Sequence, residues 1–220
     1  MEKIDRKRSL TREKVLKAAV QLIDQEGLEN FSMRKLGLAL GVEAMSLYNH
    51  IANKEELFDG VIEFLLLQIP FPETSNSSPY DDLWVFAHDF RNVLRAHPRA
   101  LPLFASRPLR TPASLSILER LLATLHRANI YGAHAIYVLN GMVGFIIGHE
   151  LLDVGSVLFS GMKPEGSHSK LWQDIPGNKY PVLHNLMSDL ENGNPDQQFS
   201  FGLQALLAFS IPPKNITREI

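Results

Sequence analysis

Apolar side chains recur at steps of three and four residues along nearly the whole 220-residue sequence, and this spacing restricts the fold more than any other feature. It places the apolar residues on one side of an α-helix, whereas a half-buried strand needs strict alternation. In the first such segment, residues 11–26, the apolar positions are Val15, Ala18, Ala19, Leu22 and Ile23. The sequence has no strand alternation and no hairpin signal. It therefore predicts an all-α protein.

Glycines, prolines and capping residues mark where these helices begin and end. Ser32 and Asn53 are suitable N-caps, and Glu56 stands where a capping box with Asn53 needs it. The expected helices cover residues 11–26, 33–40, 43–50, 53–69, 80–97, 113–127, 133–158, 181–190 and 195–210. Prolines make residues 98–112 irregular or broken helix, and residues 160–180 form a long loop rich in Gly, Ser and Pro.

A proline- and serine-rich segment, residues 70–79, separates two parts of the chain. We expect a three-helix helix-turn-helix domain at residues 1–54, a connecting helix and linker at residues 55–79, and a larger helical domain at residues 80–220. Residues 1–54 hold 10 Lys and Arg against 7 Asp and Glu, whereas residues 55–220 hold 12 against 17. A basic N-terminal part suits a phosphate-bearing partner, although solubilising basic tails are also common.

Composition excludes several classes of protein. The sequence has no cysteine, which excludes disulfides, zinc fingers and thiol catalysis. No apolar run reaches the roughly 18 residues that a membrane helix needs. The basic start of the chain has no apolar core behind it, so it does not match a secretory signal. We therefore expect a cytoplasmic protein without a membrane segment and without a cofactor.

His149, Glu150 and Asp153 invite an enzyme interpretation, because they nearly match the zinc motif His-Glu-x-x-His. The other histidines are scattered, and the sequence has no nucleophile motif and no phosphate-binding loop. We therefore expect no metal site and no enzyme activity. His149 is better interpreted as a histidine of the interior or of a subunit interface.

Residues 11–58 carry the strongest functional signal. One long and two short helices with a glycine turn at Gly41 are typical of a helix-turn-helix, whose second helix enters the major groove of DNA. The polar side of that helix would consist of Ser46, Tyr48, Asn49 and His50. The preceding Ser32 and Arg34 and the following Lys54 suit contacts with phosphates. The alternative is an αα-hairpin that merely packs.

The segment FSMRKLGLALGVEAMSLYNHIANKEELFDGV, residues 31–61, resembles the DNA-binding domain of the TetR family of bacterial transcription regulators. The resemblance implies that Tyr48, His50 and Lys54 hold phosphates of the operator. It also implies that Arg34 reaches a base edge or the backbone. Tyr48 could instead pack against the first helix, and His50 could be a C-terminal cap.

By the same resemblance, Ala44 and Met45 stand at the entry of the recognition helix, where base readout is set. Neither side chain has the bidentate polar groups that read purines. Base discrimination would then rest on Arg34, Ser46 and Asn49 and on van der Waals contact with thymine methyl groups.

The C-terminal part is similar to the tetracycline-repressor branch of the family. The similar stretches are Ala105-Ser106-Arg107-Pro108, Leu118-Glu119, and Ala135-Ile136-Tyr137 through Gly148 and Asp153. That branch grips a drug–magnesium chelate through polar groups that include a histidine and a glutamate, and these two positions hold Leu103 and Leu152 here. A hard dication needs oxygen or imidazole ligands, which leucine lacks. The resemblance with this departure predicts a more apolar effector than the tetracycline chelate.

The candidate effector-binding residues lie on helical faces of the C-terminal part. They are Trp84, Phe86, Phe90, Leu103, Phe104, Leu121 and Asn140. An apolar cavity with few polar anchors is the usual small-molecule site. The alternative is that these residues only fill a core, as most aromatic residues do.

A homodimer is expected through the helices around residues 133–158 and 195–210. The first is apolar on most of its sides, and Gly141, Gly144 and Gly148 allow a close approach of another helix. By the resemblance, two such helices from each subunit form a four-helix bundle. A two-fold dimer presents two recognition helices and reads a palindrome in double-stranded DNA.

These observations predict a DNA-binding transcription regulator, a repressor that a small, largely apolar effector releases from a palindromic operator. Two alternatives stay open, a small-molecule-binding helical protein without operator function and a metal-dependent enzyme. The basic and polar residues on the DNA-facing side argue against the first. The lack of a catalytic constellation in the sequence argues against the second.

Overall fold

The computed structural model describes residues 10–70, 77–153, 176–191 and 193–210, and every regular element in these ranges is a helix. The predicted all-α fold class is therefore confirmed. Four of the predicted features lie wholly or partly outside the described residues. They are the basic start of the chain, most of the predicted linker at residues 70–79, the end of the predicted helix 133–158 and most of the predicted loop 160–180.

The N-terminal part contains the three helices of the predicted helix-turn-helix domain and the connecting helix. They are α1 (Arg12–Glu26), α2 (Met33–Leu40), α3 (Ala44–Leu47) and α4 (Lys54–Leu66). Both predicted N-caps are confirmed: the Ser32 hydroxyl accepts from the Lys35 N–H at 3.2 Å, and the Asn53 side chain accepts from the Glu56 N–H at 2.8 Å. Gly41 ends α2 in the left-handed conformation, with φ 67°.

The recognition helix α3 is shorter than predicted. It ends at Leu47, whereas the sequence suggested residues 43–50. Tyr48 closes the helix, and the N–H groups of His50 and Ile51 both donate to the Leu47 carbonyl oxygen, at 2.9 and 3.0 Å. This turn redirects the chain toward the N-cap of α4, so residues 48–50 lie on a turn that follows the helix.

The C-terminal part is also helical. It holds α5 (Pro79–Ala96), the 3-10 helix η1 (Pro98–Ala100), α6 (Leu101–Ser106), α7 (Pro112–Arg127), α8 (Gly132–Asp153), α11 (Pro181–Asn185), α12 (Met187–Glu191) and α13 (Pro195–Ser210). The broken helix predicted over residues 98–112 is confirmed as η1 and α6, whereas the predicted helix 181–190 is divided between α11 and α12. The predicted end of α4 at Ile69 is wrong, because a residue that precedes a proline, here Pro70, avoids the helical conformation.

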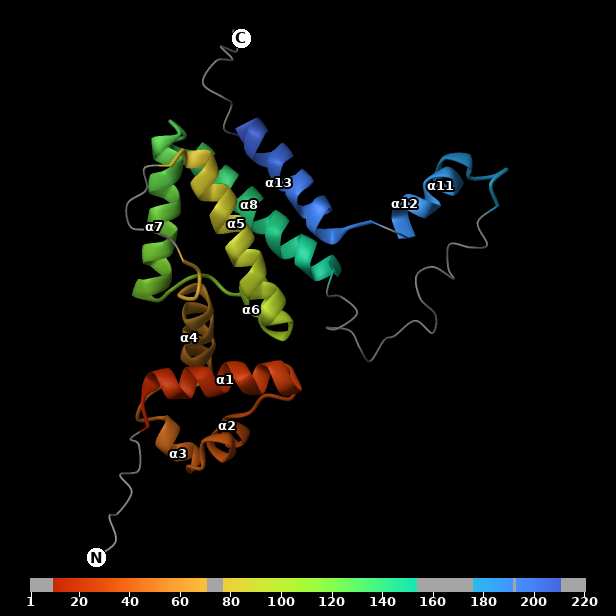
Figure 1. The fold of residues 1–220 in the computed structure, drawn as a ribbon. Helices are drawn as coiled ribbons and strands as arrows, with labels where there is room; N and C mark the ends of the chain where they lie inside the picture. The colour runs from red at the N-terminus through yellow and green to blue at the C-terminus, as the bar shows by residue number, and fades with distance from the viewer. Residues whose placement is uncertain (1–9, 71–76, 154–175, 192, 211–220) are drawn as a thin grey trace, which may run out of the picture.

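Helix α4 stands between the two parts of the molecule (Figure 1). It packs against α1 on one side and against α5, α6 and α7 on the other. Its residues Leu57, Val61 and Leu65 are fully buried and belong to one apolar cluster that extends from α1 to α13. Helix α4 therefore connects the C-terminal helices to α1, and a displacement of those helices would also displace α1–α3. The division at residues 54 and 79 stays a prediction.

Helix α8 is apolar nearly all round. By length and composition it is the one helix of the described ranges that could cross a membrane, although the sequence suggested no such segment because its apolar run was considered too short and ends near His149. It packs against α5, α6, α7 and α13. Core helices of other proteins pass the same test of length and composition. Ala135, Leu139, Met142 and Ile146 form its buried side.

Candidate nucleic-acid interface and effector core

The recognition helix α3 is held on α2 by a close approach of the two backbones. A Cβ atom added at Gly37 would lie 2.9 Å from the Val42 carbonyl oxygen and 3.1 Å from the Ala44 nitrogen. Such distances leave no room for a side chain, so glycine allows this approach. Leu47, the buried residue of α3, is fully enclosed in the core. The position of α3 on α2 therefore depends on the lack of a side chain at Gly37 and on the burial of Leu47.

The outer side of α3 and the turn that follows it present most of the predicted DNA-contacting residues. Met45 is 73% exposed and Tyr48 is 43% exposed, and Asn49 is exposed beside them. Ala44, Ser46 and His50 are half-buried, and Arg34 is exposed on α2. The structure brings these residues to one end of the molecule, and their contacts with DNA stay a prediction.

Lys54 and Ser32 each have a structural task in addition to their predicted phosphate contacts. The Lys54 ammonium donates to the Phe31 carbonyl oxygen at 3.2 Å and lies 5.6 and 5.2 Å from the ring centres of Phe31 and Phe58. It thereby fixes the start of α4 against the turn that precedes α2. The Ser32 hydroxyl is the N-cap of α2, as described above.

The segment from His97 to Arg107 joins the C-terminal bundle to the helix-turn-helix. His97 Nδ1 lies 2.8 Å from Asp24 Oδ2, and the Arg99 guanidinium donates to the Gln25 carbonyl oxygen, so both reach the end of α1. Sequence analysis described this stretch as irregular or broken helix and placed effector candidates on it, but it did not predict these contacts. Because they join residues more than 70 positions apart, no local pattern reveals them.

Arg107 forms the most extensive of these links, and it reaches α4. Its Nε and Nη2 atoms donate to Asp59 Oδ1 at 3.0 and 2.7 Å, and its Nη1 donates to Glu55 Oε2 at 2.5 Å. Burial alone would lower the pKa of Arg107, but hydrogen bonds with Glu55 and Asp59 outweigh it and raise the pKa above its ordinary value. The guanidinium also lies 5.8 Å from the Phe58 ring centre. The C-terminal end of α6 is thus fixed to α4 by charge.

Most of the predicted effector residues lie on the inner side of the same bundle. Phe86, Phe90, Leu103 and Leu121 are buried, and Phe104 is half-buried. Ring centres are 6.0 Å apart for Phe86 and Phe90 and 5.4 Å apart for Phe90 and Phe104. These residues form an aromatic core that α5, α6 and α7 share. Their contact with an effector stays a prediction.

Trp84 and Asn140 are not part of this aromatic core. Trp84 and Phe86 are two residues apart on α5, which turns their side chains about 200° away from each other. Trp84 instead stacks on Tyr80 and lies 4.8 Å from the ring centre of His88. Asn140 is exposed on α8. The two residues therefore lie on other faces than the remaining candidates.

His88 is a titratable group that sequence analysis did not single out. Its ring centre lies 4.8 Å from that of Trp84 and 5.1 Å from that of Phe199, and its Nε2 atom is buried without a hydrogen-bond partner in the described part of the chain. Desolvation lowers the pKa of His88 below its ordinary value of 6.5, and the nearby Arg91 charge lowers it further. The nearby Asp89 and Asp196 carboxylates act in the opposite direction. The imidazole is therefore neutral at neutral pH.

We expect acid to destabilise the protein through His88. The unfolded chain binds a proton near the ordinary value of 6.5, before the folded chain does, so stability falls as the pH decreases through that value. Urea denaturation at about pH 7.5 and pH 5.5 measures this loss in the wild type and in His88→Phe. The variant should lose less stability between the two pH values. Equal losses would contradict the assignment, because the lowered pKa values of Asp196 and Glu63 act at lower pH.

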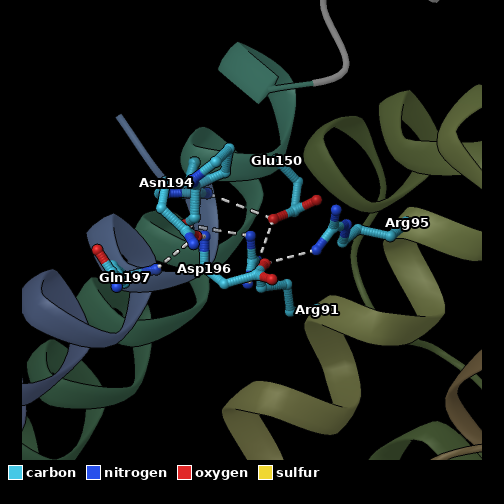
Figure 2. Close-up of polar contacts among 8 residues, drawn as sticks. Arg91, Arg95, Glu150, Asn194, Asp196 and Gln197 are labelled. Carbon is cyan, nitrogen blue, oxygen red and sulfur yellow. Dashed lines mark hydrogen bonds and ion pairs between the residues drawn. The ribbon is translucent and has the colours of Figure 1, made fainter. Parts of the chain in front are cut away.

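A buried ionic cluster lies where α5, α8 and α13 meet (Figure 2). Arg91 donates from Nε to Glu150 Oε1 at 2.5 Å, and His149 Nδ1 lies 3.3 Å from the same oxygen. Arg91 is 3% exposed and Glu150 is 0% exposed. Glu150 Oε2 is buried and has no hydrogen-bond partner within the described ranges. Glu150, considered above in a metal motif, is therefore the buried partner of Arg91.

Comparison with known proteins finds a matching domain family for each of the two parts of the chain. Residues 15–61 match the bacterial regulatory proteins of the tetR family, and residues 71–208 match the tetracyclin repressor-like C-terminal domain. An HTH-type transcriptional regulator of Saccharopolyspora erythraea is 34% identical over 202 residues, which cover 90% of this chain and 84% of that protein. The HTH-type transcriptional repressor DrrR1 of Streptomyces coeruleorubidus is 27% identical over 217 residues, covering 91% and 77%.

A solved structure is similar along most of the chain. ActR of Streptomyces coelicolor, in complex with actinorhodin, superposes with a TM-score of 0.78 at 22% identity and covers 92% of this chain and 97% of that one. At this identity the superposition shows the shared fold. The matches to the two family domains and to the relative that is 34% identical also show the family to which the chain belongs. This chain belongs to the TetR family of helix-turn-helix transcription regulators and has a tetracycline-repressor-like C-terminal domain.

Proposed function

We propose that this regulator is a repressor that binds a palindromic operator as a homodimer and leaves it when a small, largely apolar effector binds. The observation that carries the proposal is the position of the segment from His97 to Arg107. Its inner side contributes Leu103 and Phe104 to the aromatic core, and its ends bind α1 and α4 through ion pairs and hydrogen bonds. A ligand that moves this segment would move the recognition helices.

The operator would be contacted by the exposed side of α3 and the residues around it. We assign this role to Ser32, Arg34, Ala44, Met45, Ser46, Tyr48, Asn49, His50 and Lys54. The phenol and the charged groups would bind phosphates, which position the protein on the duplex. The exposed Met45 side chain would contact thymine methyl groups in the major groove.

The homodimer would form through α8 and α13. Both helices expose large apolar side chains in the single chain, among them Tyr137 and Leu152 on α8 and Phe201 and Phe209 on α13. A Cβ atom added at Gly144 or Gly148 would have open space around it, so a partner helix could approach the α8 backbone closely at these glycines. Exposed apolar surface of this extent suits a subunit interface.

The effector would occupy the aromatic core rather than a polar chelate site. DrrR1 is named as a repressor, and the ActR structure contains actinorhodin, which supports ligand-controlled repression for a related chain. Leu103 is buried in the core, and Leu152 is 86% exposed near the end of α8. Neither side chain can coordinate a hard dication. We therefore propose an apolar effector and an activity in the cytoplasm, where operators lie.

Fluorescence anisotropy of labelled DNA tests the proposal. The full-length protein is titrated into the duplex upstream of its own gene, and into a scrambled duplex, at two salt concentrations. We expect tight binding to the first duplex that weakens steeply with salt, because phosphate contacts release counterions. Equal and weak binding to both duplexes would contradict self-regulation, and selection of bound fragments from genomic DNA would then identify or exclude an operator elsewhere.

Tyr48→Phe and Lys54→Met are each expected to weaken operator binding by about 1–2 kcal/mol, because each variant removes a hydrogen bond to a phosphate. Anisotropy titration measures the loss, and circular dichroism checks that the fold persists, which matters because Lys54 also binds the Phe31 carbonyl. Lys179→Met is the matched control, since it removes an exposed lysine beyond α8. Normal operator binding by both variants would show that the contact assignment is wrong.

A further inference from the structure

Arg91 connects three helices, α5, α8 and α13, which are far apart in the sequence but pack against one another (Figure 2). Besides its bond to Glu150 in α8, its Nη1 donates to Asp196 Oδ1 at 2.8 Å and its Nη2 donates to the Pro195 carbonyl oxygen at 3.4 Å, both in the first turn of α13. The flat face of the guanidinium lies 4.4 Å from the ring centre of Phe199. One buried side chain of α5 thus holds α8 and the start of α13 together.

The first turn of α13 is shaped to meet this arginine. The Asn194 side chain accepts from the N–H groups of Asp196 and Gln197, at 2.9 and 3.2 Å, and so caps the helix. The Asp196 carboxylate also accepts from Arg95 Nη1 at 2.7 Å. Hydrogen bonds from Arg91 and Arg95 hold the pKa of Asp196 below its ordinary value, so the carboxylate is ionised at neutral pH.

The next turns of α13 show what this attachment determines. Phe199 is fully buried, with its ring centre 5.4 Å from that of Phe145 and 5.3 Å from that of His149. A Cβ atom added at Gly202 would lie 2.6 Å from the Phe145 ring, so α13 and α8 are in close contact there. Phe201 is exposed on the opposite side of the helix. The rotation of α13 about its axis therefore decides which residues face outward.

We propose that Arg91 is a positioning residue for the homodimer: by holding Asp196 and Pro195 it fixes the rotation and axial position of α13 on α8. It thereby sets the apolar surface that a second copy of the chain meets. A shift of one residue along a helix turns its side chains by about 100°, which would move Phe201 and Phe209 away from the partner. This inference rests on the homodimer through α8 and α13 proposed above.

A simple structural cross-link would act differently from a positioning residue. A cross-link stabilises each subunit, so its removal lowers the free energy of unfolding and changes dimerisation only as far as the fold weakens. A positioning residue changes the dimer dissociation constant while the subunit stays folded. Asp196 allows this distinction, because it is exposed and its loss leaves the buried bond between Arg91 and Glu150 in place.

The test uses the full-length Asp196→Ala variant and measures its dimer dissociation constant by sedimentation equilibrium. We expect an increase of roughly tenfold to a hundredfold, as the loss of charge-assisted hydrogen bonds implies, with unchanged helix content by circular dichroism. Asp196→Glu, which can still reach the two arginines, should recover most of the affinity. Asp189→Ala removes an exposed acid of α12 as the matched control and should dimerise like the wild type.

Two results would overturn the inference, and they differ in meaning. If the wild type is a dimer and the Asp196→Ala variant has the same dimer dissociation constant, only the positioning role of Arg91 is contradicted, and the proposed homodimer stands. A wild type that stays monomeric at all concentrations would contradict the proposed homodimer as well. Arg91→Lys gives a second measurement: it keeps the charge but not the planar fork, and we expect it to weaken the dimer too.

Discussion

Replacing Glu150 by leucine is expected to lower the free energy of unfolding by about 3–5 kcal/mol. The substitution leaves Arg91, which is 3% exposed, without the buried carboxylate that accepts a hydrogen bond from its Nε at 2.5 Å. Only the exposed Asp196 carboxylate then still pairs with Arg91, so most of the desolvation cost of the buried guanidinium is no longer offset. Equilibrium urea denaturation, followed by circular dichroism at two protein concentrations, measures the loss and separates it from the contribution of the proposed dimer.

The double variant Arg91→Met/Glu150→Leu is the control for this prediction. Replacing both members of a buried ion pair by apolar residues of similar volume is often neutral or stabilising. We therefore expect the double variant to recover most of the stability that Glu150→Leu loses. A single variant as stable as the wild type would contradict the view that this pair is strongly coupled.

Leu47→Ala should have the largest effect on DNA binding. Leu47 is the buried side chain of the recognition helix α3, which spans only Ala44–Leu47, and a buried leucine replaced by alanine typically costs about 2–5 kcal/mol. We expect α3 to lose its fixed position against α2 and operator binding to fall below detection. Anisotropy titration with operator DNA and urea denaturation of the same sample measure the two effects.

Met45→Ala is the matched control for Leu47→Ala, because the two residues lie two positions apart on the same helix and Met45 is 73% exposed. Its removal should change the free energy of unfolding by less than about 0.5 kcal/mol. Operator binding should weaken nonetheless, most at sites with thymine. Equal destabilisation by both variants would show that Leu47 does not anchor α3.

Local features of the fold could be predicted from sequence, because the residues that decide them are neighbours in the chain. Ser32 and Asn53 cap their helices through atoms three positions away, and the apolar spacing of α1 identifies its buried side. The end of α3 was mispredicted because it depends on the turn that leads into α4. The polar residues 48–50 gave no signal of that turn.

The candidate site was predicted less completely, for two reasons. The first concerns Trp84 and Phe86: two residues at this spacing on a helix point in nearly opposite directions, so the sequence could have predicted that they lie on different faces of α5. The pairs Arg91–Glu150 and Arg107–Asp59 are 59 and 48 positions apart, and only the packing of distant helices joins them. The one hint was that Glu150 lies within a largely apolar helix, where a buried charge needs a partner.

Two cations contact the ring of Phe58, with the Lys54 ammonium 5.2 Å and the Arg107 guanidinium 5.8 Å from its centre. The first cation is proposed to bind operator phosphate, and the second fixes α6 to α4 through Asp59. Because both share one aromatic neighbour, substitutions at these two positions are expected to combine non-additively. Genetic variation at one position would then change which residues are tolerated at the other, so operator affinity and inducer response in this lineage would evolve as linked traits.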